Sequence, residues 1–275
     1  VVRYMDQPNL VPWQYIFARG LTIFLVLNFY LFFEEGLNFY KNYLKIGISG
    51  IIGGMGLGIA MITFIFSITN TSAAITLLCL AAMPFFTALL GFLFLKEKIS
   101  INVWVAIFIA TVGIVIIALG NVQKNSLLGL IFGMTSSVGF SVFSVTLRWK
   151  KETPKFTTVA FAGLFCVVFA TIVILNNDMP FLSVSYNSGL FSLHGTLVCV
   201  GLILYSIGSK AIPAAELTLL SLTEVIGGIF WVWVPFLGVN EIPSSNTIIG
   251  GFFLFMSIIY YSLTIKTNRR FIALN

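Results

Sequence analysis

Four ionisable residues lie within long apolar stretches of the sequence: Arg19, His194, Glu216 and Glu224. A charge inside a membrane span is costly, so such residues are candidates for function. Glu224 lies deepest in its stretch and could bind a cationic group of a substrate. It is also the candidate for proton coupling, since burial makes the protonated form of a carboxylate accessible. A structural hydrogen bond in helix packing is the alternative role for Glu224.

Arg19 and His194 could complete a polar site around this acid. The guanidinium of Arg19 could attract a carboxylate or phosphate of the substrate, or pair with Glu224 if their helices meet. A single histidine such as His194 is more often satisfied by packing than used as a ligand. Glu216 stands near the start of its stretch, where the helix dipole favours an acid, so a local structural role is favoured for it.

Serine and tryptophan side chains could line the same site. Ser136 and Ser137 predict a small polar lining, although a serine in a membrane helix often bonds only a carbonyl of its own helix. Trp231 follows Glu224 by seven residues on a similar helix face and could close over an apolar substrate. Packing against a neighbouring helix is the alternative. The predicted substrate-binding residues are therefore Arg19, Ser136, Ser137, His194, Glu224 and Trp231.

Glycine and proline residues are expected to shape the helices. Gly50, Gly54 and Gly58 are four residues apart, the GxxxG spacing that lets helix backbones approach closely. Close packing is the commoner role, and a flexible face that moves during transport is the other. Pro84 is assigned a packing or conformational role of the same kind.

Composition places these residues in a membrane protein. The chain has 59% hydrophobic and only 9% charged residues, whereas soluble domains carry about 25% charged residues. Continuous apolar runs favour helices over the alternating strands of a barrel. We therefore predict an all-α polytopic bundle of nine transmembrane helices, near residues 11–33, 46–69, 72–95, 101–119, 126–147, 156–175, 188–209, 214–238 and 247–265.

The basic residues predict the orientation of this bundle. When loops are assigned to alternate sides, twelve of the Lys and Arg residues between Lys41 and Arg270 fall on one side, and the other side has only Arg3 and Lys124. The positive-inside rule then puts the C-terminus in the cytoplasm and the protein in the cytoplasmic membrane. The net charge of +6 needs no nucleic-acid partner.

Other side chains are given structural roles. Cys79, Cys166 and Cys199 lie within the apolar stretches and predict no disulfide framework. Four aromatic residues close to span ends are predicted to anchor the chain at the membrane interface: Trp13, Tyr15, Tyr40 and Tyr43.

The sequence also contains an internal repeat. Residues 73–78 are similar to residues 214–220, and each run leads through an apolar stretch to a glutamate, Glu97 and Glu241 respectively. Equivalent points are separated by five spans, and an odd number inverts the second copy in the membrane. Inverted repeats are typical of secondary transporters, whose two halves exchange conformations.

The motifs in these runs resemble those of the EamA-like branch of the drug/metabolite transporter superfamily. The matching segments are Thr71–Ala74, Met83–Gly91 and Lys96–Lys98 in the first half and Ile212–Glu216, Thr223–Val225, Ile229–Trp233 and Gly250–Gly251 in the second, together with Arg19. The resemblance covers nearly the whole chain. It implies ten helices in two inverted halves, and amino acids, related metabolites or toxic amphiphiles as substrates, usually exported.

Against this pattern, residues 1–120 read as a first repeat of four helices lacking its first helix, and residues 121–275 as a second, inverted repeat of five. A natural nine-helix protein is the alternative. The second repeat also carries about three extra residues, around Pro235.

The predicted function is secondary transport of a small organic metabolite by alternating access, driven by a proton or other ion gradient. Membrane lipids and the substrate are the expected partners. The sequence has one histidine and no CxxC or phosphate-binding motif, so we expect no enzyme activity, no cofactor and no metal. An intramembrane enzyme or a channel is the alternative.

Overall fold

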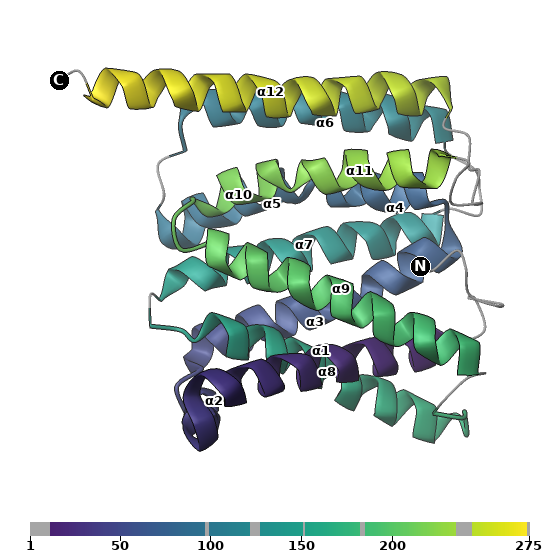
Figure 1. The fold of residues 1–275 in the computed structure, drawn as a ribbon. Helices are drawn as coiled ribbons and strands as arrows, with labels where there is room; N and C mark the ends of the chain where they lie inside the picture. Colours follow the sequence, from purple (N-terminus) through teal and green to yellow (C-terminus); the bar gives the residue numbers. More distant parts are fainter. Residues whose placement is uncertain are drawn as a thin grey trace.

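The computed structural model describes residues 12–96, 99–121, 127–150, 152–181, 185–234 and 244–273, and these contain helices and no strand. The prediction of an all-α helical bundle is confirmed (Figure 1). The elements are α1 (Pro12–Glu35), a 3-10 helix (Gly36–Tyr40), α2 (Lys41–Leu44), α3 (Gly47–Asn70), α4 (Ala73–Leu80), α5 (Met83–Leu90), a π-helical turn (Gly91–Leu95), α6 (Ile101–Asn121), α7 (Leu127–Trp149), α8 (Lys155–Asn176), α9 (Ser185–Gly208), α10 (Ala214–Leu220), α11 (Leu222–Trp233) and α12 (Ser245–Ala273).

Among the described residues, six helical segments are long and apolar enough to cross a membrane. They are Pro12–Leu44, Gly47–Asn70, Ile75–Leu95, Leu127–Trp149, Lys155–Asn176 and Asn187–Gly208. Two shorter apolar segments, Ile101–Ile116 and Ile248–Thr264, belong to α6 and α12. Each of the nine predicted stretches is thus mostly helical over its described part.

Two of the predicted stretches contain a short break in the helix, which the sequence analysis did not predict. The stretch 72–95 divides into α4 and α5 at Ala81 and Ala82, and Pro84 lies in the first turn of α5, where it needs no amide hydrogen bond. The stretch 214–238 divides into α10 and α11 at Ser221. Residues 235–243, which include the predicted insertion around Pro235 and Glu241, lie outside the described residues, as does Glu97.

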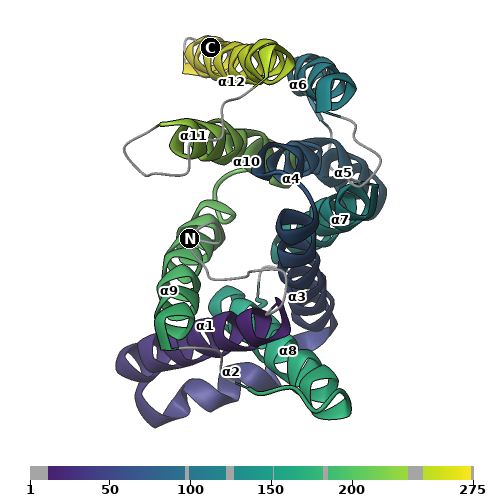
Figure 2. The same ribbon diagram turned by 90° about the vertical axis from the view of Figure 1, so that its right-hand side faces the viewer.

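The two broken stretches are the two that resemble each other in sequence, and they lie side by side. α10 packs against α5 and α11 packs against α4, so the first half of each contacts the second half of the other (Figures 1 and 2). Two segments that pair in this way run antiparallel. The arrangement is the one that an inverted repeat would produce.

The buried side chains form two hydrophobic clusters. The first includes side chains of α1, α3, α7, α8 and α9, and the second includes side chains of α4, α5, α6, α10, α11 and α12. Two phenylalanines, Phe64 on α3 and Phe140 on α7, pack against both clusters. These two residues therefore mark the junction between the two parts of the bundle.

Glycines bring α3 close to α7 and α8, the two helices that it contacts most extensively. A Cβ atom added at Gly54 would lie 2.5 Å from Cδ1 of Phe161 on α8, and one at Gly58 would lie 2.5 Å from Cδ1 of Phe165. A Cβ atom added at Gly50 would lie 3.0 Å from Oγ1 of Thr158, which is also on α8. The GxxxG stripe of α3 thus receives side chains of α8, which a larger residue would displace.

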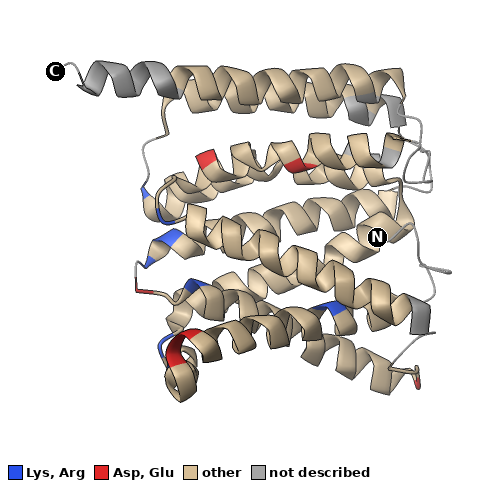
Figure 3. Cartoon of the chain, in the orientation of Figure 1, with Lys and Arg blue, Asp and Glu red and all other residues tan. Residues whose placement is uncertain are grey.

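Apart from Arg19, which lines the interior, most of the Lys and Arg residues drawn in blue gather at one end of the bundle (Figure 3). In that region the guanidinium of Arg148 donates to the Ile212 carbonyl at 2.7 Å, and the ammonium of Lys155 donates to Ser209 Oγ at 2.9 Å. The three cysteines are buried and free, in agreement with the absence of a predicted disulfide framework.

Candidate substrate site

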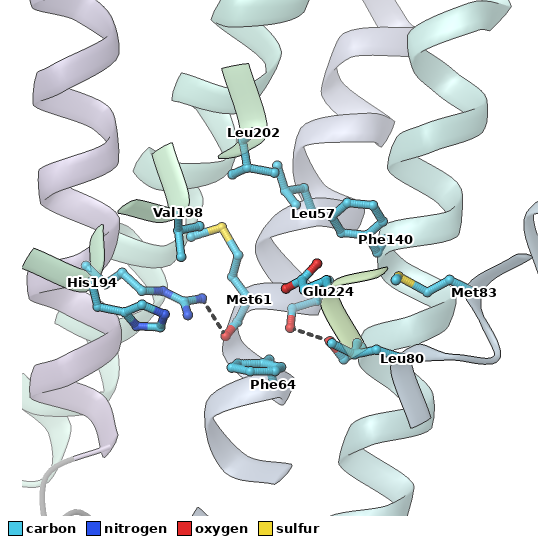
Figure 4. A pocket seen from close by; sticks show the side chains of 13 residues that line it. Leu57, Met61, Phe64, Leu80, Met83, Phe140, His194, Val198, Leu202 and Glu224 are labelled. Atoms are coloured by element: carbon cyan, nitrogen blue, oxygen red, sulfur yellow. Dashed lines mark hydrogen bonds between the residues drawn. The ribbon is translucent and has the colours of Figure 1, made fainter. Parts of the chain in front are cut away.

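A cavity of about 120 Å³ lies where the two hydrophobic clusters meet. One water molecule needs roughly 10–15 Å³ on the same measure, so the cavity can hold a small organic molecule. Its walls are formed by α1, α3, α4–α5, α7, α9 and α11. Most of the lining side chains are apolar (Figure 4). The lining residues are Arg19, Leu57, Ala60, Met61, Phe64, Leu80, Met83, Ser136, Phe140, His194, Val198, Leu202 and Glu224.

Arg19 provides a buried cation on the α1 wall of this cavity. Its side chain is 3% exposed, and Nη2 donates to the Met61 carbonyl of α3 at 2.9 Å. The guanidinium carbon lies 5.9 Å from the centre of the Tyr15 ring, while Nε is buried and has no hydrogen-bond partner. A guanidinium has five N–H donors, so Arg19 keeps donors for a ligand.

Glu224 provides an acid on another wall, which belongs to α11. The break at Ser221 puts Glu224 in the first turn of α11, where the helix dipole favours a negative charge. Its side chain is exposed and points toward the cavity between Met61 and Phe140 (Figure 4). Arg19 and Glu224 line the same cavity, but no ion pair joins them among the described residues. The charges are therefore available to opposite ends of one ligand.

The internal repeat relates Glu224 to another lining residue. Ala73 and Ala214 are separated by 214 − 73 = 141 residues, and Met83 and Glu224 by 224 − 83 = 141. Met83 lies in the first turn of α5 as Glu224 does in α11, and both residues line the cavity. Equivalent positions of the two broken stretches thus face the same space, one with a thioether and one with a carboxylate.

His194 lies on the α9 wall and is held by Tyr15 of α1. The Tyr15 hydroxyl is hydrogen-bonded to His194 Nδ1, and the two rings are stacked with their centres 5.6 Å apart. Tyr15 is 1% exposed and belongs to the first hydrophobic cluster. The prediction that Tyr15 anchors the chain at the membrane interface is therefore wrong, because α1 turns this residue toward α9 instead of the lipid.

The two predicted serines bond to neighbouring helices. Ser136 lines the cavity, and its hydroxyl donates to the Ala60 carbonyl of α3 at 2.9 Å. Ser137 is fully buried, donates to the Cys79 carbonyl of α4, and is not among the lining residues. Ser136 is thus in a position to contact a ligand, whereas Ser137 joins α7 to α4.

The remaining candidates lie away from the cavity. Trp231 is 57% exposed, contacts Phe230 at a ring distance of 6.0 Å and does not line the cavity. Its predicted role as a cover for the substrate is not supported by this geometry. Glu216 accepts a hydrogen bond from the Tyr261 hydroxyl and so joins α10 to α12. No group of three metal-ligating side chains occurs in the described part of the chain.

The structure adds lining residues that the sequence did not single out, chiefly Met61, Phe64, Met83 and Phe140. Each is one apolar residue within a long apolar stretch, so hydropathy alone does not mark it. The 141-residue offset could have identified Met83 as the counterpart of Glu224. Tyr15 carried no signal beyond its aromatic ring near a span end.

Comparison with known proteins relates this sequence to transporters. Residues 1–119 match the model of the EamA-like transporter family. A protein of Helicobacter pylori strain J99 named "Uncharacterized transporter" is 30% identical over 175 residues, or 62% of this chain and 57% of that protein. Its counterpart in strain 26695 is 29% identical over the same shares. The chain thus spans just over half the length of these curated relatives.

A more distant relative and a solved structure extend the likeness along the chain. The "Pseudopaline exporter CntI" of Pseudomonas aeruginosa PAO1 is 22% identical over 222 residues, covering 80% of this chain and 75% of that protein. One crystal structure shares the fold with a TM-score of 0.71 at 15% identity, covering 94% of this chain and 89% of the other. The predicted resemblance to EamA-like transporters is therefore confirmed, and residues 1–119 carry the family match.

Proposed function

We propose that the protein is a secondary transporter that moves a small organic metabolite through the cavity by alternating access. The observation that carries this proposal is a mainly apolar cavity with Arg19 and Glu224 on different walls, at the junction of two packed clusters. Ionisable side chains within membrane-spanning segments cost free energy and are therefore candidates for function. Binding of a substrate supplies the partner for each.

The substrate class follows from the two charges. A compound with both a carboxylate and an ammonium group, an amino acid or a related metabolite, would place its carboxylate at Arg19 and its ammonium at Glu224. The apolar remainder would lie against Met61, Phe64 and Phe140. An amphiphilic, drug-like cation is the second candidate and would require only Glu224. The two classes therefore differ in whether Arg19 takes part.

Transport would result from rocking of the two halves, residues 1–120 and 121–275, around the cavity. The antiparallel pairing of α4–α5 with α10–α11 supports inverted halves. Export from the cytoplasm is the proposed direction, in keeping with the relative named as an exporter. The end of the bundle that is rich in cations would face the cytoplasm, together with the C-terminus, in a cytoplasmic membrane.

A ligand series tests the substrate class. The thermal stability of the purified full-length protein would be measured with L-leucine, with N-acetyl-L-leucine, which lacks the ammonium group, and with L-leucinamide, which lacks the carboxylate. A ligand that binds the folded state raises the melting temperature. A shift with L-leucine alone would support the amino-acid class, and a shift with L-leucinamide alone would favour the amphiphilic cation. In proteoliposomes, saturable counterflow of the unaltered compound would argue against a channel or an enzyme.

Replacement of Arg19 by Lys is expected to weaken carboxylate binding about tenfold while leaving the affinity for a cation without a carboxylate unchanged. Lysine keeps the charge but loses the planar, two-donor geometry and the bond from Nη2 to the Met61 carbonyl. Dissociation constants for L-leucine and L-leucinamide would be compared in the two proteins. Equal affinity of Arg19→Lys and wild type for L-leucine would remove Arg19 from the proposed site.

Glu224 is also the proposed site of proton coupling. A carboxylate that is protonated in one conformation and binds the substrate in the other would exchange a proton for each substrate moved. Proteoliposomes with an imposed pH gradient should therefore transport faster than those without one. Transport that is indifferent to the gradient would exclude the proton as the coupling ion.

A further inference from the structure

The wall formed by α1 and α9 carries a second polar group besides Arg19, and its chemical state can be worked out. His194 lines the cavity, and its Nδ1 is engaged by the Tyr15 hydroxyl. The guanidinium of Arg19 packs over the same tyrosine ring, 5.9 Å from its centre. Tyr15, Arg19 and His194 therefore form one connected group, here called the donor triad.

The charge around the donor triad favours a neutral imidazole. Arg19 is a permanent cation, so a second positive charge beside it would be opposed by repulsion. Among the described residues, the acid that lines the cavity is Glu224, which lies on α11 and forms no hydrogen bond with His194. A neutral imidazole has one N–H donor and one bare acceptor nitrogen.

Tyr15 then decides which nitrogen carries the hydrogen. A phenol donates well, and Nδ1 can accept its hydrogen bond only when that nitrogen is bare. Because a phenol is a stronger acid than the N–H of a neutral imidazole, the arrangement in which Tyr15 donates is favoured, and it places the imidazole hydrogen on Nε2. This nitrogen has no hydrogen bond to any described residue, so its N–H is left for a ligand in the cavity.

We propose that Tyr15 holds His194 as a neutral Nε2–H donor, and that this donor and the Arg19 guanidinium together form a subsite for a carboxylate. The proposed role of this subsite in transport rests on the proposed function, whereas carboxylate binding itself does not. Every polar group that the donor triad offers to the cavity is a donor, so the subsite requires acceptor atoms on the ligand. Tyr15 itself is a positioning residue, because it acts through His194.

The sequence makes a direct test possible, because His194 is the only histidine in the chain. Protein labelled with ¹⁵N-histidine and purified without a histidine tag would give the two imidazole nitrogens of one residue by NMR. The expected spectrum has a protonated Nε2 and a bare Nδ1 with no ligand present. A hydrogen on Nδ1, or on both nitrogens, would overturn the proposal.

Two variants separate the positioning role of Tyr15 from a general effect on folding. Tyr15→Phe should release Nδ1 and shift the hydrogen toward it, giving averaged nitrogen signals. Tyr43→Phe is the matched control, because the Tyr43 hydroxyl also donates a hydrogen bond, to Asn28 Oδ1 at 2.9 Å, but lies outside the cavity. An unchanged His194 spectrum in Tyr15→Phe would show that the tyrosine does not fix the tautomer.

The carboxylate subsite is tested with small probes that do not depend on knowing the substrate. Sodium acetate should move the Nε2 signal of the wild-type protein in a saturable way, whereas acetamide and sodium chloride at the same concentration should not. Arg19→Gln should abolish the response to acetate. Equal responses to acetate and acetamide, or none to acetate, would overturn the subsite. Failure of transport alone would count against the proposed function and leave this result standing.

Discussion

Glu224→Gln is expected to lower the transport of an ammonium-bearing substrate by about ten- to a hundredfold. The amide keeps the size of the side chain but removes the negative charge, so the ammonium group would enter the cavity without a counter-charge. A hydrogen bond to a charged group contributes roughly 1.5–3 kcal/mol, and each 1.4 kcal/mol is about tenfold in affinity. Initial rates in proteoliposomes, measured as a function of substrate concentration, would give the effect on KM and on the maximal rate.

The control variant removes one glutamate charge outside the cavity. Glu34 lies exposed near the end of α1, outside the cavity, so Glu34→Gln changes the net charge equally without touching the site. Wild-type rates are expected for this variant. If Glu224→Gln also retained wild-type rates and affinity, the acid would have only a structural role, and neither substrate binding nor proton coupling could be assigned to it.

The helical class and most helix positions could be predicted from sequence, because lipid imposes one local rule on every span: apolar side chains outside and backbone hydrogen bonds within the helix. That rule does not specify where a span breaks. The breaks at Ala81–Ala82 and at Ser221 depend on how α4–α5 and α10–α11 pack against each other. Pro84 was the local signal for the first break, and the second has no proline within it.

The ionisable residues of the candidate site could be predicted from the sequence, but most of its apolar lining residues could not. Arg19, His194 and Glu224 stood out because ionisable residues are rare in apolar stretches, and all three line one cavity. The sequence did not show whether Trp231 and Tyr15 point inward or outward, and the reason is the same for both. An aromatic ring is favourable both toward lipid and in a protein core, so its residue type does not tell which helix face points inward. The structure turns Tyr15 inward and Trp231 outward.

Gly139→Ala is expected to lower the stability of the folded protein by about 1–3 kcal/mol, the usual cost of forcing extra atoms into a packed interface. A Cβ atom added at Gly139 on α7 would lie 2.6 Å from the Gly56 carbonyl oxygen on α3, and backbone atoms cannot move aside as a side chain can. The reciprocal position is equally tight, since a Cβ at Gly56 would lie 2.9 Å from the Gly139 carbonyl oxygen. The effect would be measured as the midpoint of thermal unfolding in detergent.

Gly201→Ala on α9 provides the matched comparison, because a Cβ there would meet no atom within 4 Å.

Function should change as well as stability in Gly139→Ala. The seam between α3 and α7 carries Met61 on one side and Ser136 and Phe140 on the other, so separating the helices moves two walls of the cavity. The double variant with Gly56→Ala should destabilise by less than the sum of the single variants, since either one alone already opens the seam. Equal melting temperatures for Gly139→Ala and Gly201→Ala would show that the two backbones are not in the close contact on which the cavity wall depends.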